Sequence, residues 1–240
     1  MERGLSVGLS TYLRNLNTNV GLTYAFERKS SSDPQLGTEL GLTDANIGSI
    51  SLRSSHSTVD NILYPTAGYE ISSSLRYAAK ELGGETEYFR PEIGASWHTK
   101  LDDRWIIHLA GKGGYISLPN NDFETFPILE RFVIGGENSL RGFRRGEGIP
   151  SGAESYVLFN AEVEYPIFDK LNAVLFLDVA RVWAWPTAGY ENRYEDLADI
   201  GIGFRYKTIV GPVRLEYGHN IDPRNEDPKG TIHLSIGFPF

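Results

Sequence analysis

The chain has 240 residues, of which 23 are basic and 31 are acidic, giving a formal net charge of −8. This acidic balance argues against a nucleic-acid partner, which requires a basic surface, and the lack of cysteine excludes a disulfide framework and thiolate chemistry. The longest apolar run, 173–177, is far shorter than the roughly 20 residues of a membrane-spanning helix.

Apolar and polar residues alternate along the whole chain. A period of two is typical of a β-strand with one apolar and one polar face. In chain order the alternating segments are 5–9, 20–26, 50–56, 69–77, 92–98, 105–115, 157–165, 171–180, 200–206, 213–218 and 231–240. The segment 50–56 has the weakest pattern, and no segment has a competing helical period. The sequence therefore predicts an all-β fold with about eleven strands.

The polar faces of these strands bear on two all-β architectures. In a soluble sandwich the apolar face packs inward, whereas in an outer-membrane barrel it contacts lipid and the polar face lines a wet interior. The polar faces carry Glu92, Lys112, Glu162, Glu164, Arg205, Arg214 and Glu216. Aromatic residues gather near strand ends, at Tyr165, Trp183, Trp185, Tyr206, Tyr217, Phe238 and Phe240. Charges suit a lumen and aromatic rings suit interfacial girdles, so both patterns favour a transmembrane antiparallel barrel.

The lengths of the connections point the same way. Long polar connections at 28–46, 119–153, 186–196 and 219–230 alternate with short turns. This asymmetry is expected when tight turns face one side of a membrane and long loops face the other. A connection as long as 119–153 without secondary structure is usually functional.

The loop 119–153 contains a motif that carries a family resemblance. It comprises two glycines and a Ser-Leu-Arg-Gly-Phe run, at Gly135, Gly136, Ser139, Leu140, Arg141, Gly142 and Phe143. This segment resembles the sixth extracellular loop of the Omp85 superfamily, also called the bacterial surface antigen D15 family. The turn Asp60–Gly68 and the end Gly237–Phe240 are similar to a further turn motif and to the C-terminal assembly signal of that family.

The resemblance implies a position for this loop. In the family the loop folds back inside the barrel, where a guanidinium group needs carboxylate partners to offset its desolvation. The matching family positions imply Glu162 and Asp178 as the lumen partners of Arg141. Gly142 is expected to let the chain turn tightly beside Arg141, and Phe143 is expected to pack against the wall. We therefore expect the arginine cluster to hold the loop inside the barrel.

The resemblance also implies a function. Family members insert, assemble or translocate other proteins at the outer membrane of a Gram-negative-type envelope. They are thought to use a weak seam between the first and last strands, here 5–13 against 231–240, where a client strand adds to the open edge. The residues of the C-terminal signal and seam are Ile232, Leu234, Ile236, Gly237, Phe238 and Phe240. The implied partners are the lipid bilayer, unfolded outer-membrane protein clients and accessory assembly subunits.

Two features depart from the family pattern. Family barrels have sixteen strands, usually preceded by periplasmic POTRA modules, whereas about six strands precede the loop here and five follow it. At roughly 20 residues per strand and connection, the length suits about twelve strands if the chain closes alone. We expect residues 1–240 to form a single barrel domain without a POTRA domain, either shortened or part of a larger protein. A passive pore and a structural barrel fragment without insertase activity stay open as alternative functions.

The sequence shows no sign of enzymatic chemistry. It contains no nucleophile-elbow, Walker or dinucleotide motif. The histidines His56, His98, His108, His219 and His233 lack the spacing of metal ligands. We therefore expect a protein that is not an enzyme and that uses neither a metal nor a cofactor.

Overall fold

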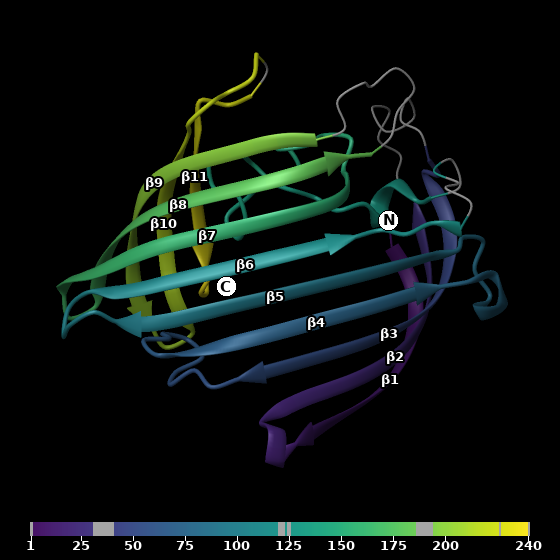
Figure 1. Ribbon diagram of the computed structural model, residues 1–240, viewed down its shortest axis with the longest axis horizontal. Helices are drawn as coiled ribbons and strands as arrows, with labels where there is room; N and C mark the ends of the chain where they lie inside the picture. Colours follow the sequence, from purple (N-terminus) through teal and green to yellow (C-terminus); the bar gives the residue numbers. More distant parts are fainter. Residues whose placement is uncertain are drawn as a thin grey trace.

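A computed structural model describes residues 2–30, 41–119, 123, 126–185, 194–225 and 227–239, which form one antiparallel sheet with its strands in chain order (Figure 1). The strands are β1 (Glu2–Leu13), β2 (Thr18–Ser30), β3 (Asp44–Ser57), β4 (Gly68–Ala78), β5 (Tyr88–Lys100), β6 (Ile106–Tyr115), β7 (Ala153–Phe168), β8 (Leu171–Ala184), β9 (Tyr194–Thr208), β10 (Gly211–Asn220) and β11 (Gly230–Ile236). Short 3-10 turns lie at η1 (Arg14–Leu16), η3 (Lys80–Leu82) and η5 (Ile128–Glu130). The prediction of an all-β fold with about eleven strands is confirmed, and the weakly patterned segment 50–56 lies within β3.

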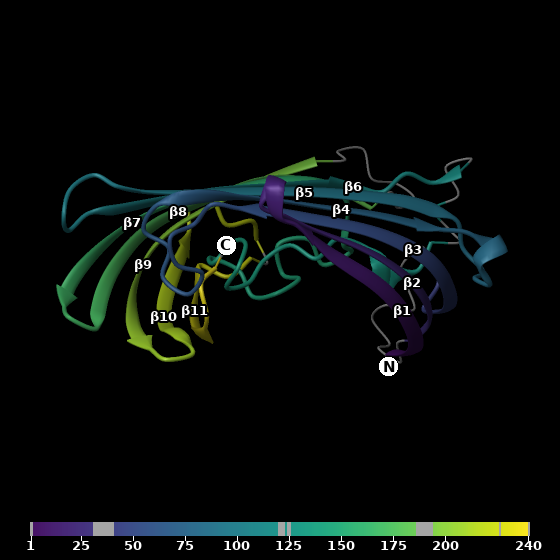
Figure 2. The same cartoon turned by 90° about the horizontal axis from the view of Figure 1, so that it is seen from below.

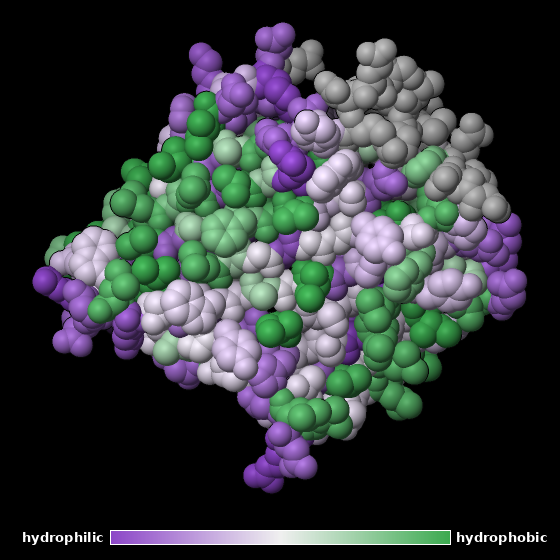
Figure 3. All heavy atoms as spheres, viewed as in Figure 1, coloured by the Kyte–Doolittle hydropathy of each residue, from purple (hydrophilic) through white to green (hydrophobic). Residues whose placement is uncertain are grey.

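The outer, convex face of the sheet is apolar and uncovered. Side chains on this face, such as Leu175, Ile202 and Leu234, are 59%, 55% and 76% exposed. Figure 3 shows hydrophobic side chains spread over the strands on this side. The alternative of a soluble sandwich is wrong, because no second sheet packs on the apolar face of the described strands (Figure 2). No described helix is long and apolar enough to cross a membrane.

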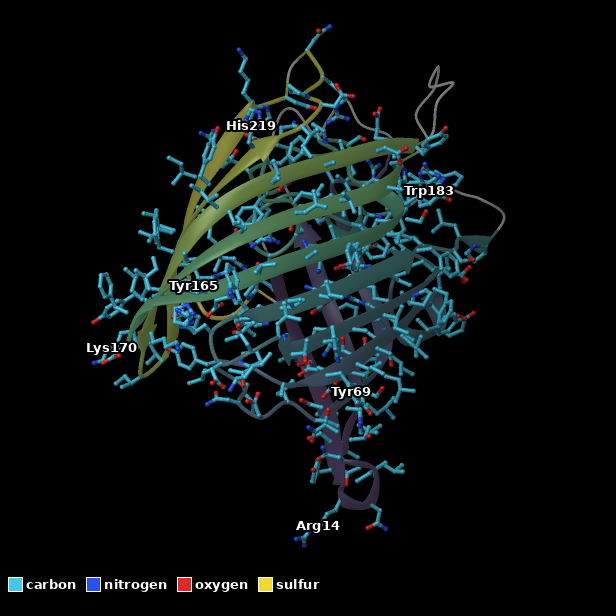
Figure 4. All side chains as sticks on the ribbon, turned by 60° about the vertical axis from the view of Figure 1, so that its left-hand side comes forward. Arg14, Tyr69, Tyr165, Lys170, Trp183 and His219 are labelled. Carbon is cyan, nitrogen blue, oxygen red and sulfur yellow. The ribbon has the colours of Figure 1, made fainter. Side chains whose placement is uncertain are left out.

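The connections differ in length between the two ends of the sheet. At one end, Asp169 and Lys170 join β7 to β8, and Ile209 and Val210 join β9 to β10. At the other end, the loop between β6 and β7 spans 116–152. Figure 4 shows aromatic side chains near both ends, with Tyr69 and Tyr165 toward the short turns and Trp183 toward the long loops.

The sheet is open, which corrects the expected seam. Among the described residues, β1 pairs with β2 alone and β11 pairs with β10 alone, so segments 5–13 and 231–239 do not pair with each other. Figure 2 shows the two edge strands on opposite sides of a broad concave sheet, with the loop between β6 and β7 in the hollow. The eleven described strands therefore form a curved sheet that does not close on itself.

Two aromatic residues lie inside the concave face rather than in an interfacial girdle. Gly237 has a φ of +105°, and its N–H donates to the carbonyl of Pro212, so the chain leaves the strand direction after β11. Phe238 then packs edge-on against His98 and His108, with centroids 5.6 and 5.0 Å apart. Trp185 is buried and stacks on Phe126 of the loop at 4.6 Å. Phe240 lies outside the described residues.

A hydrophobic core joins the loop to the inner wall. Loop side chains Phe126, Phe132, Ile134, Leu140 and Phe143 are buried in one cluster with wall residues that include Ile47, Tyr88, Leu158, Val182 and Leu197. Burial of large apolar side chains is the main driving force for such packing. The loop is therefore a packed part of the fold, and its charged groups are fixed at defined places on the wall.

Candidate functional site: an arginine loop on the inner wall

The glycine-rich part of the loop forms a compact turn. Gly135 and Gly136 have φ values of +107° and +108°, which side chains with a Cβ rarely adopt. The N–H of Gly136 donates to the carbonyls of Leu140 and Phe143 at 3.1 and 3.0 Å, and the Ser139 hydroxyl accepts from Gly135 N–H at 3.1 Å. Leu140 and Phe143 are fully buried. This turn places Arg141 with its side chain directed at the wall.

Arg141 is enclosed by the carboxylates of Glu162 and Asp178, which together form a carboxylate cage. Its side chain is 1% exposed. Nε and Nη2 donate to the two oxygens of Asp178 at 2.8 and 2.7 Å, and Nη1 donates to Glu162. The guanidinium carbon also lies 3.5 Å from the ring centroid of Phe176. Burial lowers the pKa of Arg141, but the charges of Glu162 and Asp178 outweigh it and raise the pKa above its usual value, so the group stays charged.

The wall contains a second row of ion pairs that sequence reasoning did not assign to the site. Arg205 of β9 donates to Glu162 at 2.7 Å and to Glu216 at 2.9 Å, and it reaches Glu164 at 3.1 Å. Arg214 of β10 donates to the side chain of Asn138 in the loop at 2.7 Å. The alternation of apolar and polar residues places Arg205 and Arg214 on the polar face of their strands. Which groups they pair with depends on the register of neighbouring strands.

Asn160 of β7 links the loop backbone to the cage. Its side-chain amide donates to the carbonyl of Ser139 at 2.7 Å and to Asp178 at 2.8 Å. Buried carboxylates that accept several hydrogen bonds are held in one orientation. Asn160 therefore orients Asp178 toward Arg141.

Glycines on both sides of the contact allow the loop backbone to touch the wall. A Cβ on Gly142 would lie 2.6 Å from the Cβ of Asp199, and a Cβ on Gly218 of β10 would lie 2.3 Å from the backbone carbon of Arg141. Gly142 does not have a positive φ. The expected tight turn beside Arg141 is present, since the Phe143 N–H donates to the Leu140 carbonyl at 3.2 Å across Arg141 and Gly142, and the lack of a Cβ at Gly142 also allows close approach to Asp199.

The last strand also contacts the loop. On β11, the Thr231 hydroxyl donates to the carbonyl of Gly142 at 3.1 Å, and His233 Nε2 lies 3.0 Å from the carbonyl of Arg141. Ile232, Leu234 and Ile236 alternate with these residues and point outward, 66–76% exposed. The C-terminal segment thus presents an apolar face outward and a loop-binding face inward.

The histidines do not form a metal centre in the part of the chain that the structure describes, where no group of three metal-ligating side chains occurs. His98 and His108 are nevertheless neighbours, with their Nδ1 atoms 2.9 Å apart. They pair directly across β5 and β6. Sequence reasoning treated them as scattered because strand register is not visible in their spacing.

Comparison with known proteins identifies the family. A family model described as the Omp85 superfamily domain matches residues 2–240. An outer membrane protein assembly factor, BamA of Nitratidesulfovibrio vulgaris, is 24% identical over 210 residues, covering 81% of this chain and 26% of that protein. The chloroplastic outer envelope protein 80 of Arabidopsis thaliana is 30% identical over 127 residues, covering 47% of this chain and 15% of that protein.

Solved structures share the fold. The crystal structure of BamA from Haemophilus ducreyi lacking POTRA domains 1–3 superposes with a TM-score of 0.77 at 18% identity, covering 98% of this chain and 54% of that one. CdiB from Escherichia coli superposes with a TM-score of 0.57 at 11% identity, covering 99% of this chain and 53% of that one. The chain spans about half the length of these solved chains and about a quarter of the BamA relative.

Proposed function

The chain belongs to the Omp85 superfamily, and from this premise we propose that it inserts, assembles or translocates other proteins at the outer membrane. Its outward apolar side chains contact lipid, and its polar concave face holds the loop. The single observation that carries the proposal is the uncovered apolar outer face of a sheet whose concave face holds the arginine loop.

The free edges suit strand addition. On β1, Leu5, Val7 and Leu9 are 82%, 74% and 82% exposed, and the strand pairs with β2 on one side alone within the described residues. Unpaired backbone groups in lipid are costly because no water is present to satisfy them. A client strand that pairs with such an edge satisfies its own backbone and that of the edge at once.

The arginine cluster supports a second part of the proposal. We propose that Arg141, through Glu162 and Asp178, holds the loop on the inner wall and thereby keeps the last strands in position beside an edge. β11 contacts the same part of the loop through Thr231 and His233. The edge that receives a client strand would then be supported from inside.

The remaining parts of the proposal concern partners and chemistry. We propose that residues 1–240 act as one barrel domain that works with the lipid bilayer, unfolded outer-membrane proteins and accessory assembly subunits. The relatives are named as an assembly factor and an envelope protein, which agrees with a function that is not enzymatic. We propose that no metal or cofactor takes part.

Site-specific crosslinking tests the proposal. Since the chain has no cysteine, Leu9→Cys on β1 and Leu175→Cys on β8 each create a single thiol on the same outer face, one at a free edge and one inside the paired sheet. The chain is reconstituted in phospholipid vesicles and incubated with an unfolded outer-membrane protein that carries one cysteine in its terminal strand. We expect crosslinks at position 9, few at position 175, and faster folding of the client than in empty vesicles.

Two outcomes would support other functions. Steady ion conductance without crosslinks at position 9 would indicate a passive pore. Neither conductance nor crosslinks, with no acceleration of client folding, would indicate a structural barrel fragment.

A further inference from the structure

A buried glutamate lies at the other end of the loop, away from Arg141. Glu130, in η5, has a side chain that is 1% exposed. Its carboxylate is 2.6 Å from Lys29 Nζ and 3.2 Å from Arg76 Nη1, and the hydroxyl of Tyr88 donates to it at 2.8 Å. Arg90 Nη1 lies 3.7 Å away. Nothing in the sequence motif of the loop indicated a role for Glu130.

The two ends of the loop bind opposite halves of the sheet with opposite charges. The basic partners of Glu130 lie on β2, β4 and β5, whereas the acidic partners of Arg141 lie on β7, β8 and β10. Each end of the loop is therefore held on the wall by groups of the opposite charge.

Two arginines of the wall face each other at this place, each beside a wall carboxylate: Arg76 lies 2.9 Å from Glu27 and Arg90 lies 3.3 Å from Glu92. Arg76 and Arg90 are directly opposite each other in the register of β4 and β5, and like charges in such a pair are destabilising. Glu130 contacts both. Burial raises the pKa of Glu130, but the charges of Arg76 and Lys29 outweigh it and keep the pKa below its usual value, so the carboxylate is ionised.

We propose that Glu130 is a second anchor of the loop, which positions the first strands of the sheet as the Arg141 cluster positions the last strands.

This anchor reaches the first edge strand. Lys29 Nζ lies between Glu130 and Glu2 of β1, at 2.6 and 3.3 Å from their carboxylates. At the opposite end, the carbonyls of Arg141 and Gly142 contact β11. The loop therefore contacts β11 directly and reaches β1 through Lys29 of β2. The anchoring role rests on these contacts alone. A further consequence rests on the proposed function: release of the loop should loosen both edge strands and so favour strand addition.

A disulfide reporter measures docking at the Glu130 end. Leu42 and Pro127 form a bridge, with Leu42 N–H donating to the Phe126 carbonyl and Ile128 N–H donating to the Leu42 carbonyl, both at 3.0 Å. Residues paired in this way are close enough for a disulfide. The double variant Leu42→Cys, Pro127→Cys holds the only two thiols of the full chain, and the initial rate of their oxidation reports the docked fraction.

Charge reversal at Glu130 should undock this end. In the reporter background, Glu130→Lys puts a fourth cation among three and should lower the oxidation rate by about tenfold or more, because breaking a buried ion pair is strongly destabilising. The matched control is Glu147→Lys, a charge reversal in the same loop at a residue whose partner, Arg144, is 77% exposed. Equal rates in the two variants would overturn the proposal.

Two variants with uncharged substitutions test the same contact if Glu130→Lys does not fold. Glu130→Gln should lower the oxidation rate less, and adding Arg76→Gln should restore part of it by removing one of the two directly opposed arginines. Without the Glu130 carboxylate, Arg76 keeps Glu27 as a partner at 2.9 Å and Arg90 keeps Glu92 at 3.3 Å. The absence of any loss in Glu130→Gln, or of any recovery in the double variant, would contradict the anchoring role.

Client crosslinking at position 9 separates the two claims. Slower oxidation together with altered crosslinking supports both the anchor and its effect on the edge. Slower oxidation with unchanged crosslinking supports the anchor and contradicts its effect on strand addition, and a chain that never crosslinks contradicts the proposed function alone.

Discussion

Arg141 and Asp178 form a two-point ion pair, in which Nε and Nη2 lie 2.8 and 2.7 Å from the two carboxylate oxygens. The backbone N–H of Arg141 donates to the same carboxylate at 3.2 Å. A planar guanidinium fits this arrangement while its third nitrogen reaches Glu162, which a lysine ammonium cannot do.

Arg141→Lys should destabilise the folded chain although it preserves the charge. Loss of the two-point contact leaves Asp178 and Glu162 incompletely hydrogen-bonded in a buried cluster, and a hydrogen bond to a charged group contributes about 1.5–3 kcal/mol. The urea midpoint in detergent, followed by heat-modifiable mobility on gels, measures the loss. Arg144→Lys, at a side chain that is 77% exposed, is the control and should leave the midpoint unchanged. An unchanged midpoint in Arg141→Lys as well would show that the guanidinium geometry does not hold the loop.

Gly142→Ala and Gly218→Ala should each push the loop off the wall. The new methyl groups would lie 2.6 Å from Asp199 and 2.3 Å from the Arg141 backbone, distances that force a shift. Overpacking of this kind costs about 1–3 kcal/mol. The control is Gly21→Ala in β2, where the nearest atom would be 3.7 Å away. Urea midpoints measure the difference, and equal effects at Gly21 and Gly218 would argue against a special contact.

Asp60 should make the turn between β3 and β4 sensitive to acid. Burial is the largest single influence and raises the pKa of Asp60, but hydrogen bonds from the Thr66 hydroxyl and from the N–H groups of Thr66 and Ala67 together outweigh it and lower the pKa from 3.8 to about 2. A lowered pKa means that the carboxylate stabilises the fold above pH 4 and loses this effect as the pH falls toward 2. Asp60→Asn should therefore be less stable than the parent chain at pH 6, and the difference in urea midpoint should shrink below pH 4. A difference that is constant across this range would contradict the role of the ionised carboxylate.

Tyr64→Phe should loosen the contact between two distant turns. The Tyr64 hydroxyl donates to the Thr208 carbonyl and accepts from the Thr208 N–H, both at 2.6 Å, so it joins the β3–β4 turn to the end of β9. Removing it leaves two half-buried backbone groups without this partner, which costs about 1–3 kcal/mol. Faster hydrogen exchange at Thr208 is the expected result. Tyr115→Phe, at a side chain that is 48% exposed, should leave the exchange rate at Thr208 unchanged.

Local pattern was enough to predict the strands and much of the loop motif. The alternation around Leu175 and Ile202 is a property of neighbouring residues, since successive side chains point to opposite faces of a strand. Glu162 and Asp178 could be named because the chain carries a recognisable family motif around Arg141. The charges at Arg205, Arg214 and Glu216 were visible as inward residues but not as partners.

Tertiary structure decided which of these groups meet. Arg76 faces Arg90, and Glu130 lies between them, because strand register and the fold of the loop bring three distant segments together. No local pattern contains that information, since a shift of one residue in register would turn each side chain to the other face.

The sequence by itself determined an all-β chain with an apolar and a charged face, because the alternation of apolar and polar side chains is a property of adjacent residues. Only the tertiary structure decided that the sheet stays open, that Phe238 turns inward after Gly237, and that the loop contacts both halves of the wall. Those features depend on curvature, register and long-range packing, which arise when distant strands come together.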